Sequence, residues 1–204
     1  KYQIIPPTPF VPGKEAAGVV IAVGTDVEHI QPGNRVLVEV DYGAFAKQVT
    51  ADVQRTFVLP DEIAMPTAAA MGLVYQTAYI ALTERASLRA GETVLVTGAS
   101  GGIGLATVQL AKAFGATVLA ATSDPTKFDA VRYAGADHVI DLSMTPLRDK
   151  LRDQVYTATG GKGVDVVLDV VGGQVFDASL RSLAFGGRIV VLGFTSTEIP
   201  NIKS

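Results

Sequence analysis

The chain has 204 residues, of which 48% are hydrophobic and 18% are charged, and its formal net charge is −3. This composition is too apolar for a disordered chain and predicts one large hydrophobic core or two modest ones. The 17 basic residues against 20 acidic ones form no basic run, which excludes an electrostatic surface for nucleic acid. The absence of cysteine excludes disulfides, thiolate zinc ligands and a cysteine nucleophile, and it fits a cytoplasmic location.

The first 60 residues contain short apolar runs separated by turn-forming residues. The runs are residues 19–23, 35–40 and 45–50, and the turns contain Gly24, Gly33 and Gly43. Short runs and turns of this kind predict antiparallel β-strands. The chain opens on Lys1 without a methionine or a signal-like segment, so we expect it to be a piece of a longer protein.

Residues 63–82 carry no charge and are numerous enough to cross a bilayer. Pro66, Gly72, Gln76 and several alanines make the segment too polar and too small for that role. We therefore predict a helix of small residues buried against a sheet, and we expect no membrane as a partner.

From about Thr93 onward, apolar strands alternate with longer helical stretches. The predicted strands are residues 93–97, 117–121, 138–140, 164–169 and 188–192, and the predicted helices are residues 102–114, 126–134, 145–159 and 174–184. This alternation predicts parallel strands joined by right-handed crossovers, that is, a doubly wound α/β sheet. Five strands are present where six complete a dinucleotide-binding fold, which indicates a missing C-terminal part.

A glycine cluster, Gly-Ala-Ser-Gly-Gly-Ile-Gly, follows the first of these strands at residues 98–104. Glycines at this place allow a sharp turn and let a pyrophosphate approach the main chain. The first turn of the next helix then supplies free N–H groups to the phosphates. A tight structural turn gives a similar pattern, but the strand before it and the helix after it favour a nucleotide site.

Two other phosphate-binding families do not fit. No Gly-Lys-Ser/Thr follows the glycines, which excludes a P-loop. A short-chain dehydrogenase needs a Tyr-x-x-x-Lys pair further along, and neither Tyr133 nor Tyr156 is followed by one. The glycine turn also comes after a complete β-rich segment, whereas short-chain enzymes usually begin with it.

The β-rich segment carries the family resemblance. It contains Pro-Gly-Lys-Glu-Ala-Ala-Gly at residues 12–18, Pro-Gly-Asn-Arg-Val at 32–36, Gly-Ala-Phe-Ala at 43–46 and Gly-Glu-Thr-Val-Leu-Val at 91–96. Together with the glycine turn, these motifs resemble the medium-chain dehydrogenase/reductase superfamily, in its zinc-independent quinone oxidoreductase (zeta-crystallin-like) branch. The resemblance implies a partial GroES-like domain at residues 1–65 and a Rossmann dinucleotide-binding domain, without its last strand, at residues 66–204. It also implies a homodimer in the full-length protein.

The zinc dehydrogenases of this superfamily carry a histidine ligand where this chain has Lys14. His29 and His138 are the two histidines, and their spacing is not that of a zinc site, so we predict no metal. Without a Lewis acid, hydride transfer needs an acceptor that is already electrophilic, such as a quinone or a conjugated enone. No catalytic residue can be named in this sequence.

The predicted cofactor residues lie where the glycine-bearing turns follow their strands. By resemblance, the turn after the fifth strand holds the nicotinamide carboxamide through its backbone, and Thr77 contributes a hydroxyl. The predicted set is Thr77, Ser100, Gly101, Gly102, Ile103, Ser123, Lys127, Val171, Gly193 and Phe194. Ordinary strand-end turns are the alternative interpretation.

NAD preference normally shows as an acidic residue at the end of the second strand, and this chain has Thr122 there. By resemblance, Ser123 and Lys127 meet the 2′-phosphate of NADPH, whereas Asp124 could bind a ribose instead. We expect an NADPH-dependent reductase of a quinone or conjugated carbonyl. An enoyl-thioester reductase, alone or in a synthase, and a non-catalytic NADPH-binding protein of the crystallin type are the alternatives.

Overall fold

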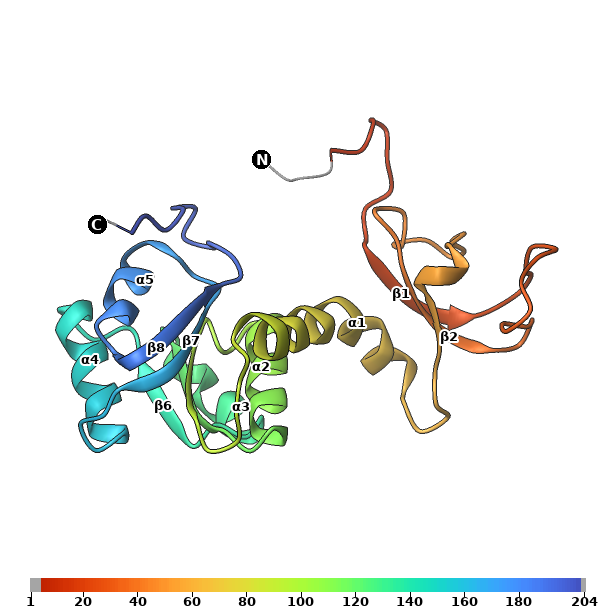
Figure 1. The fold of residues 1–204 in the computed structure, drawn as a ribbon. Coiled ribbons are helices and arrows are strands. Elements are labelled where there is room, and N and C mark those ends of the chain that lie inside the picture. Colours follow the sequence, from red (N-terminus) through yellow and green to blue (C-terminus); the bar gives the residue numbers. More distant parts are fainter. Residues whose placement is uncertain (1–4, 203–204) are drawn as a thin grey trace. The chain divides into compact units, whose positions relative to one another are not determined.

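The computed structural model describes residues 5–202. The chain divides into two compact units, Lys1–Val74 and Tyr75–Ser204. The division falls inside one long helix, and each unit has a sheet of its own (Figure 1).

The first unit is built on a three-stranded antiparallel sheet. Its strands are β1 (Glu15–Val19), β2 (Arg35–Glu39) and β3 (Thr56–Val58), in the order β1-β2-β3, and a short 3-10 helix, η1 (Val53–Arg55), precedes β3. Three buried side chains, Ile30, Val36 and Val38, form a small core under the sheet.

Two strands predicted in this unit are misplaced. Strand β1 ends at Val19, where the predicted run 19–23 begins. Val20 N–H still donates to the Asn34 carbonyl, but the partner segment turns away at Gly33, whose φ is +93°. The predicted strand 45–50 is irregular. The edge of β2 that it would need is occupied by β3, and Phe45 N–H donates to the Pro12 carbonyl instead.

The segment read as a small-residue helix forms α1 (Met65–Ile80), which continues into a π-helical turn, η2 (Ala81–Arg85). Within residues 5–202, none of the helices has the length and apolar character needed to cross a membrane. The expectation that the helix is buried is only partly met. Ala68 and Ala78 are fully buried, but Leu73 is 40% exposed and Tyr79 is 51% exposed.

The second unit is a doubly wound parallel sheet, as predicted. Its strands are β4 (Thr93–Thr97), β5 (Thr117–Thr122), β6 (His138–Asp141), β7 (Val164–Asp169) and β8 (Leu183–Val191), in the order β6-β5-β4-β7-β8. Its helices are α2 (Gly102–Ala113), α3 (Phe128–Tyr133) after the 3-10 helix η3 (Pro125–Lys127), α4 (Leu147–Ala158) and α5 (Gly173–Leu180).

The predicted helix 174–184 is too long. Helix α5 ends at Leu180, and β8 begins at Leu183, opposite Val164 of β7. The ladder between β7 and β8 is irregular between Val164 and Val166, and it absorbs the extra residues before Arg188. The segment that begins at Leu183 therefore pairs with β7, although its local pattern favours a helix.

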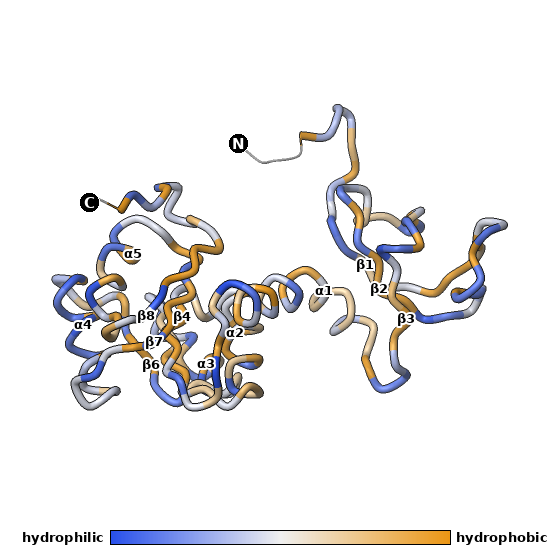
Figure 2. The backbone as a smooth tube through the Cα atoms, in the orientation of Figure 1, coloured by the Kyte–Doolittle hydropathy of each residue, from blue (hydrophilic) through white to orange (hydrophobic). Residues whose placement is uncertain are grey.

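Apolar side chains cover both faces of this sheet. On one face, buried residues of β4, β5 and β7 pack with Val108 of α2 and Val131 of α3. On the other face, they pack with Leu151 of α4 and Ala178 of α5. Hydrophobic residues follow the central strands and hydrophilic ones follow the outside of α4 (Figure 2). This two-sided core fixes the strand ends that carry the predicted site.

Candidate cofactor site

The chain goes from β4 to β5 on one side and returns to β7 on the other, so the strand order reverses between β4 and β7. In open parallel sheets, ligands bind at such a point, outside the carboxyl ends of the strands. The predicted cofactor residues other than Thr77 follow the carboxyl ends of β4, β5, β7 and β8. The sheet therefore brings residues from distant parts of the sequence to one edge.

The turn between β4 and α2 has a backbone that tolerates little change. Gly98 has a φ of +60°, and a Cβ atom there would lie 2.6 Å from a methyl carbon of Val170. A Cβ atom on Gly104 would lie 2.3 Å from the Gly98 carbonyl oxygen. The glycines thus let α2 begin directly against the end of β4.

Helix α2 begins at the site with its backbone accessible. Gly101 is its N-cap, and Gly101 and Gly102 are exposed while Ile103 is half-buried. The first N–H groups of a helix have no partner within that helix, and they favour an anion. The hydroxyl oxygens of Ser100 and Thr122 lie 3.1 Å apart and join this turn to the end of β5. The geometry suits a phosphate group.

The loop after β5 holds the residues predicted to select the cofactor. Ser123 and Lys127 are exposed, and Lys127 Nζ lies 3.7 Å from Asp124 Oδ2. Asp124 accepts hydrogen bonds from the hydroxyl and the backbone N–H of Thr126, and these bonds, with the nearby Lys127 charge, lower the pKa of its carboxyl group. The loop therefore presents one cation whose charge is partly balanced by a neighbouring carboxylate.

The turns after β7 and β8 are held together by their backbones. Thr195 N–H donates to the Val170 carbonyl at 3.1 Å, and Ser196 N–H donates to the Val171 carbonyl at 2.9 Å. Val171 and Gly193 are half-buried, whereas Phe194 is 47% exposed. These three predicted residues thus lie on two joined turns.

Two residues of this edge were missed by the sequence interpretation. Thr97 and Asp169 are the last residues of β4 and β7, both are fully buried, and the Thr97 hydroxyl donates to Asp169 Oδ1 at 2.5 Å. Their only signal in the sequence is a polar residue at the end of a predicted strand.

The remaining predicted residue, Thr77, lies on α1 and is half-buried. Both histidines, His29 and His138, are exposed. Across residues 5–202, no three histidine, cysteine, aspartate or glutamate residues come together as metal ligands.

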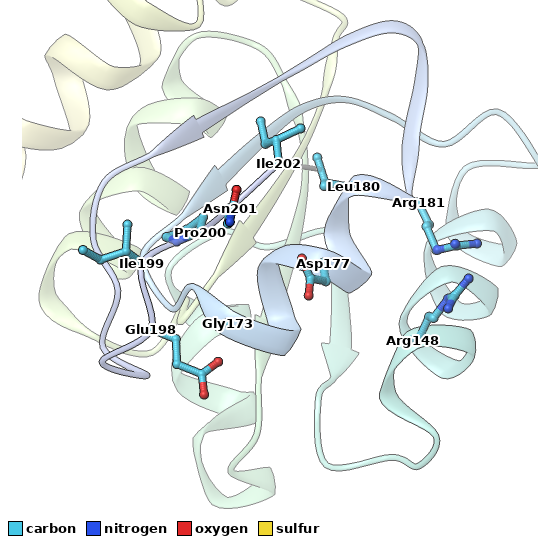
Figure 3. A pocket seen from close by; sticks show the side chains of 10 residues that line it. All are labelled: Arg148, Gly173, Asp177, Leu180, Arg181, Glu198, Ile199, Pro200, Asn201 and Ile202. Atoms are coloured by element: carbon cyan, nitrogen blue, oxygen red, sulfur yellow. The ribbon is translucent and has the colours of Figure 1, made fainter. Parts of the chain in front are cut away.

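A pocket of about 590 Å³ lies beside α5 (Figure 3). Its lining includes two basic residues, Arg148 and Arg181, and two acidic residues, Asp177 and Glu198, so the formal charges of these four side chains cancel. None of the predicted cofactor residues lines it. We therefore do not place the site there.

Comparison with known families fits both units. The model of the zinc-binding dehydrogenase family matches residues 102–204, and the model of the alcohol dehydrogenase GroES-like domain matches residues 1–61. The chain belongs to the medium-chain dehydrogenase/reductase superfamily. Within it, the chain falls in the quinone oxidoreductase-like branch, and its units are part of a GroES-like domain and a Rossmann-like domain.

The relatives of this superfamily member are longer than the chain. It is 41% identical over 205 residues to the quinone oxidoreductase-like protein 2 of Mus musculus, and it spans 57% of that protein's length. The chain is also similar to Escherichia coli quinone oxidoreductase in its crystal structure complexed with NADPH, with 32% sequence identity and a TM-score of 0.88 over 98% of this chain and 61% of that one. The CurK enoyl reductase is 30% identical, with a TM-score of 0.82 over 95% of this chain and 56% of that one.

Proposed function

We propose that the chain binds NADPH at the carboxyl edge of its parallel sheet, and that the full-length protein transfers hydride to a quinone or conjugated carbonyl compound without zinc. The turn between β4 and α2 carries the proposal. There, Gly98 and Gly104 exclude side chains while the first turn of α2 stays open. A pyrophosphate requires a backbone that it can approach closely and the N-terminus of a helix beside it.

The residues divide between the two ends of the cofactor. Ser100, Gly101, Gly102 and Ile103 would hold the pyrophosphate, and Ser123 and Lys127 would meet the 2′-phosphate. Thr122 stands where an acidic residue would select NAD, which supports NADPH. The NADPH complex of the similar Escherichia coli enzyme supports the same choice.

At the other end, the backbone of Val171, Gly193 and Phe194, with the hydroxyl of Thr77, would hold the nicotinamide. Bound NADPH supplies a hydride, so the chain's residues need to orient the nicotinamide face and exclude water. No cluster of metal-ligating side chains forms among residues 5–202, and an acceptor that is already electrophilic, as quinones and conjugated carbonyls are, would need no Lewis acid. This restricts the reaction without naming a catalytic residue.

Reduction of an enoyl thioester is a second candidate, supported by the similarity to the CurK enoyl reductase. The same cofactor residues would serve both reactions, and the acceptor alone distinguishes them. Comparing 1,4-benzoquinone with a short enoyl-CoA as acceptors, while nicotinamide absorbance is followed, decides between the two.

The test is a fluorescence titration of the full-length protein with NADPH and with NADH. We expect tighter binding of NADPH, and we expect Lys127→Ala to remove most of that preference because the cation at the 2′-phosphate is lost. Lys162→Ala is the matched control, since Lys162 is an exposed lysine just before β7, at the opposite edge of the sheet. Equal binding of both cofactors would contradict the choice of NADPH, and binding of neither would refute the site.

A further inference from the structure

Asp169 closes β7 with a side chain that has no access to solvent. Its Oδ1 atom accepts from the Thr97 hydroxyl at 2.5 Å and from Val171 N–H at 3.2 Å, and its Oδ2 atom accepts from Gly172 N–H at 3.0 Å. The Thr97 oxygen in turn accepts from Val170 N–H at 3.2 Å. One carboxylate and one hydroxyl therefore fix three consecutive backbone N–H groups.

These bonds connect the two ends of the proposed cofactor site. Thr97 directly precedes Gly98, the first glycine of the phosphate-side turn. The turn that Asp169 holds is bonded to the next one, where Thr195 N–H and Ser196 N–H donate to the Val170 and Val171 carbonyls. A continuous set of hydrogen bonds thus runs from the phosphate side to the turn that carries Phe194.

The carboxylate is a costly way to close a strand. Burying a charge carries a large desolvation penalty, and within residues 5–202 none of the ion pairs includes Asp169. An apolar residue would suit the core at lower cost. The carboxylate instead determines geometry, because each of its oxygens accepts from groups whose positions it thereby fixes.

We propose that Asp169 and Thr97 are positioning residues that set the distance between the phosphate-binding turn and the backbone groups of Val171 and Phe194. They do not touch the cofactor themselves. This inference rests on the proposed NADPH site. It predicts that disturbing the pair displaces the nicotinamide while leaving the adenosine end of the cofactor in place.

The test compares Thr97→Val, Thr97→Ser and Asp169→Asn in the full-length protein. Thr97→Val removes the hydroxyl at nearly constant volume, and Thr97→Ser keeps it. Asp169→Asn opposes an amide N–H to the Gly172 N–H. Ser179→Ala is the control, because the buried Ser179 hydroxyl donates only within α5, to the Val175 carbonyl.

Two ligands separate the two ends of the site. For Thr97→Val and Asp169→Asn, we expect kcat with NADPH to fall about tenfold or more. Their Kd for adenosine 2′,5′-bisphosphate should stay within about twofold of the wild type, because that ligand has no nicotinamide. Thr97→Ser and Ser179→Ala should match the wild type in both measurements.

Unchanged kcat in folded Thr97→Val would overturn the inference. A fall in kcat accompanied by an equal loss of affinity for adenosine 2′,5′-bisphosphate would overturn it too, because that result indicates general disruption. If Asp169→Asn does not fold, the Thr97 pair decides alone. A wild-type protein that binds neither ligand would refute the proposed function itself, which is a distinguishable result.

Discussion

Arg188 and Glu92 form a two-point ion pair between β8 and the residue that precedes β4. Arg188 Nη1 donates to Glu92 Oε1 at 2.9 Å, and Nη2 donates to Oε2 at 2.7 Å. The same guanidinium group also donates to the backbone carbonyls of Ala86 and Ser87. A single side chain therefore attaches the edge strand β8 to the segment that leads into β4.

Replacing this arginine should weaken the second unit. Arg188→Lys keeps the charge but loses the planar fork, and it leaves backbone carbonyls without a donor. We expect the free energy of unfolding to fall by about 1–3 kcal/mol. Urea unfolding measures this. Arg132→Lys is the control, since Arg132 pairs with the almost fully exposed Asp129. An equal loss of unfolding free energy in this variant would show that the Arg188 network stabilises the fold no more than an exposed ion pair does.

The same pair predicts a dependence of stability on pH. The hydrogen bond from Arg188 lowers the pKa of Glu92, so the folded state favours the charged carboxylate. This contribution is complete above the ordinary glutamate pKa of about 4.3 and is lost as the pH falls through the lowered value. Urea midpoints should therefore decline less steeply below about pH 4 in Glu92→Gln than in the wild type. Parallel declines would contradict the prediction.

Gly104→Ala should disrupt the start of α2. The new Cβ atom would lie 2.3 Å from the Gly98 carbonyl oxygen and 2.6 Å from Ala99 Cα, both of which are main-chain atoms in the tightest part of the turn. We expect a loss of about 2–4 kcal/mol in unfolding free energy, as for overpacking of a rigid site, together with weaker NADPH binding. Gly24→Ala, where an added Cβ meets nothing within 4 Å, should change neither.

Asp124→Asn should strengthen NADPH binding. The substitution keeps an oxygen that can accept from Thr126, but it removes the negative charge 3.7 Å from Lys127 Nζ. With Lys127 free to meet the 2′-phosphate, we expect the Kd for NADPH to fall roughly two- to fivefold at low salt, and less at high salt. NADH binding should not improve. Asp129→Asn, one turn further on and paired with Arg132, serves as the control.

The strands of the second unit could be predicted because each is an apolar run bounded by turn residues. The prediction for Val164–Asp169 matches β7, and that for Thr93–Thr97 matches β4. In the first unit, local pattern was a poorer guide. Residues 45–50 follow a turn and predict a strand, yet β1 and β3 already occupy both edges of β2. A strand depends on an available partner, which no local window contains.

The sequence by itself determined the class of fold, the glycine turn and the family, because these depend on local order: apolar period, turn residues and spacing. Only the tertiary structure decided which side chains meet at the site. Thr97 and Asp169 are 72 positions apart and join solely because β4 and β7 are neighbours in the sheet. The same pairing places Asp169 against the N–H groups of the turn that follows it. Hydrogen bonds between distant residues follow from strand order and register, and the polar partner of a buried group is therefore visible only in the folded chain.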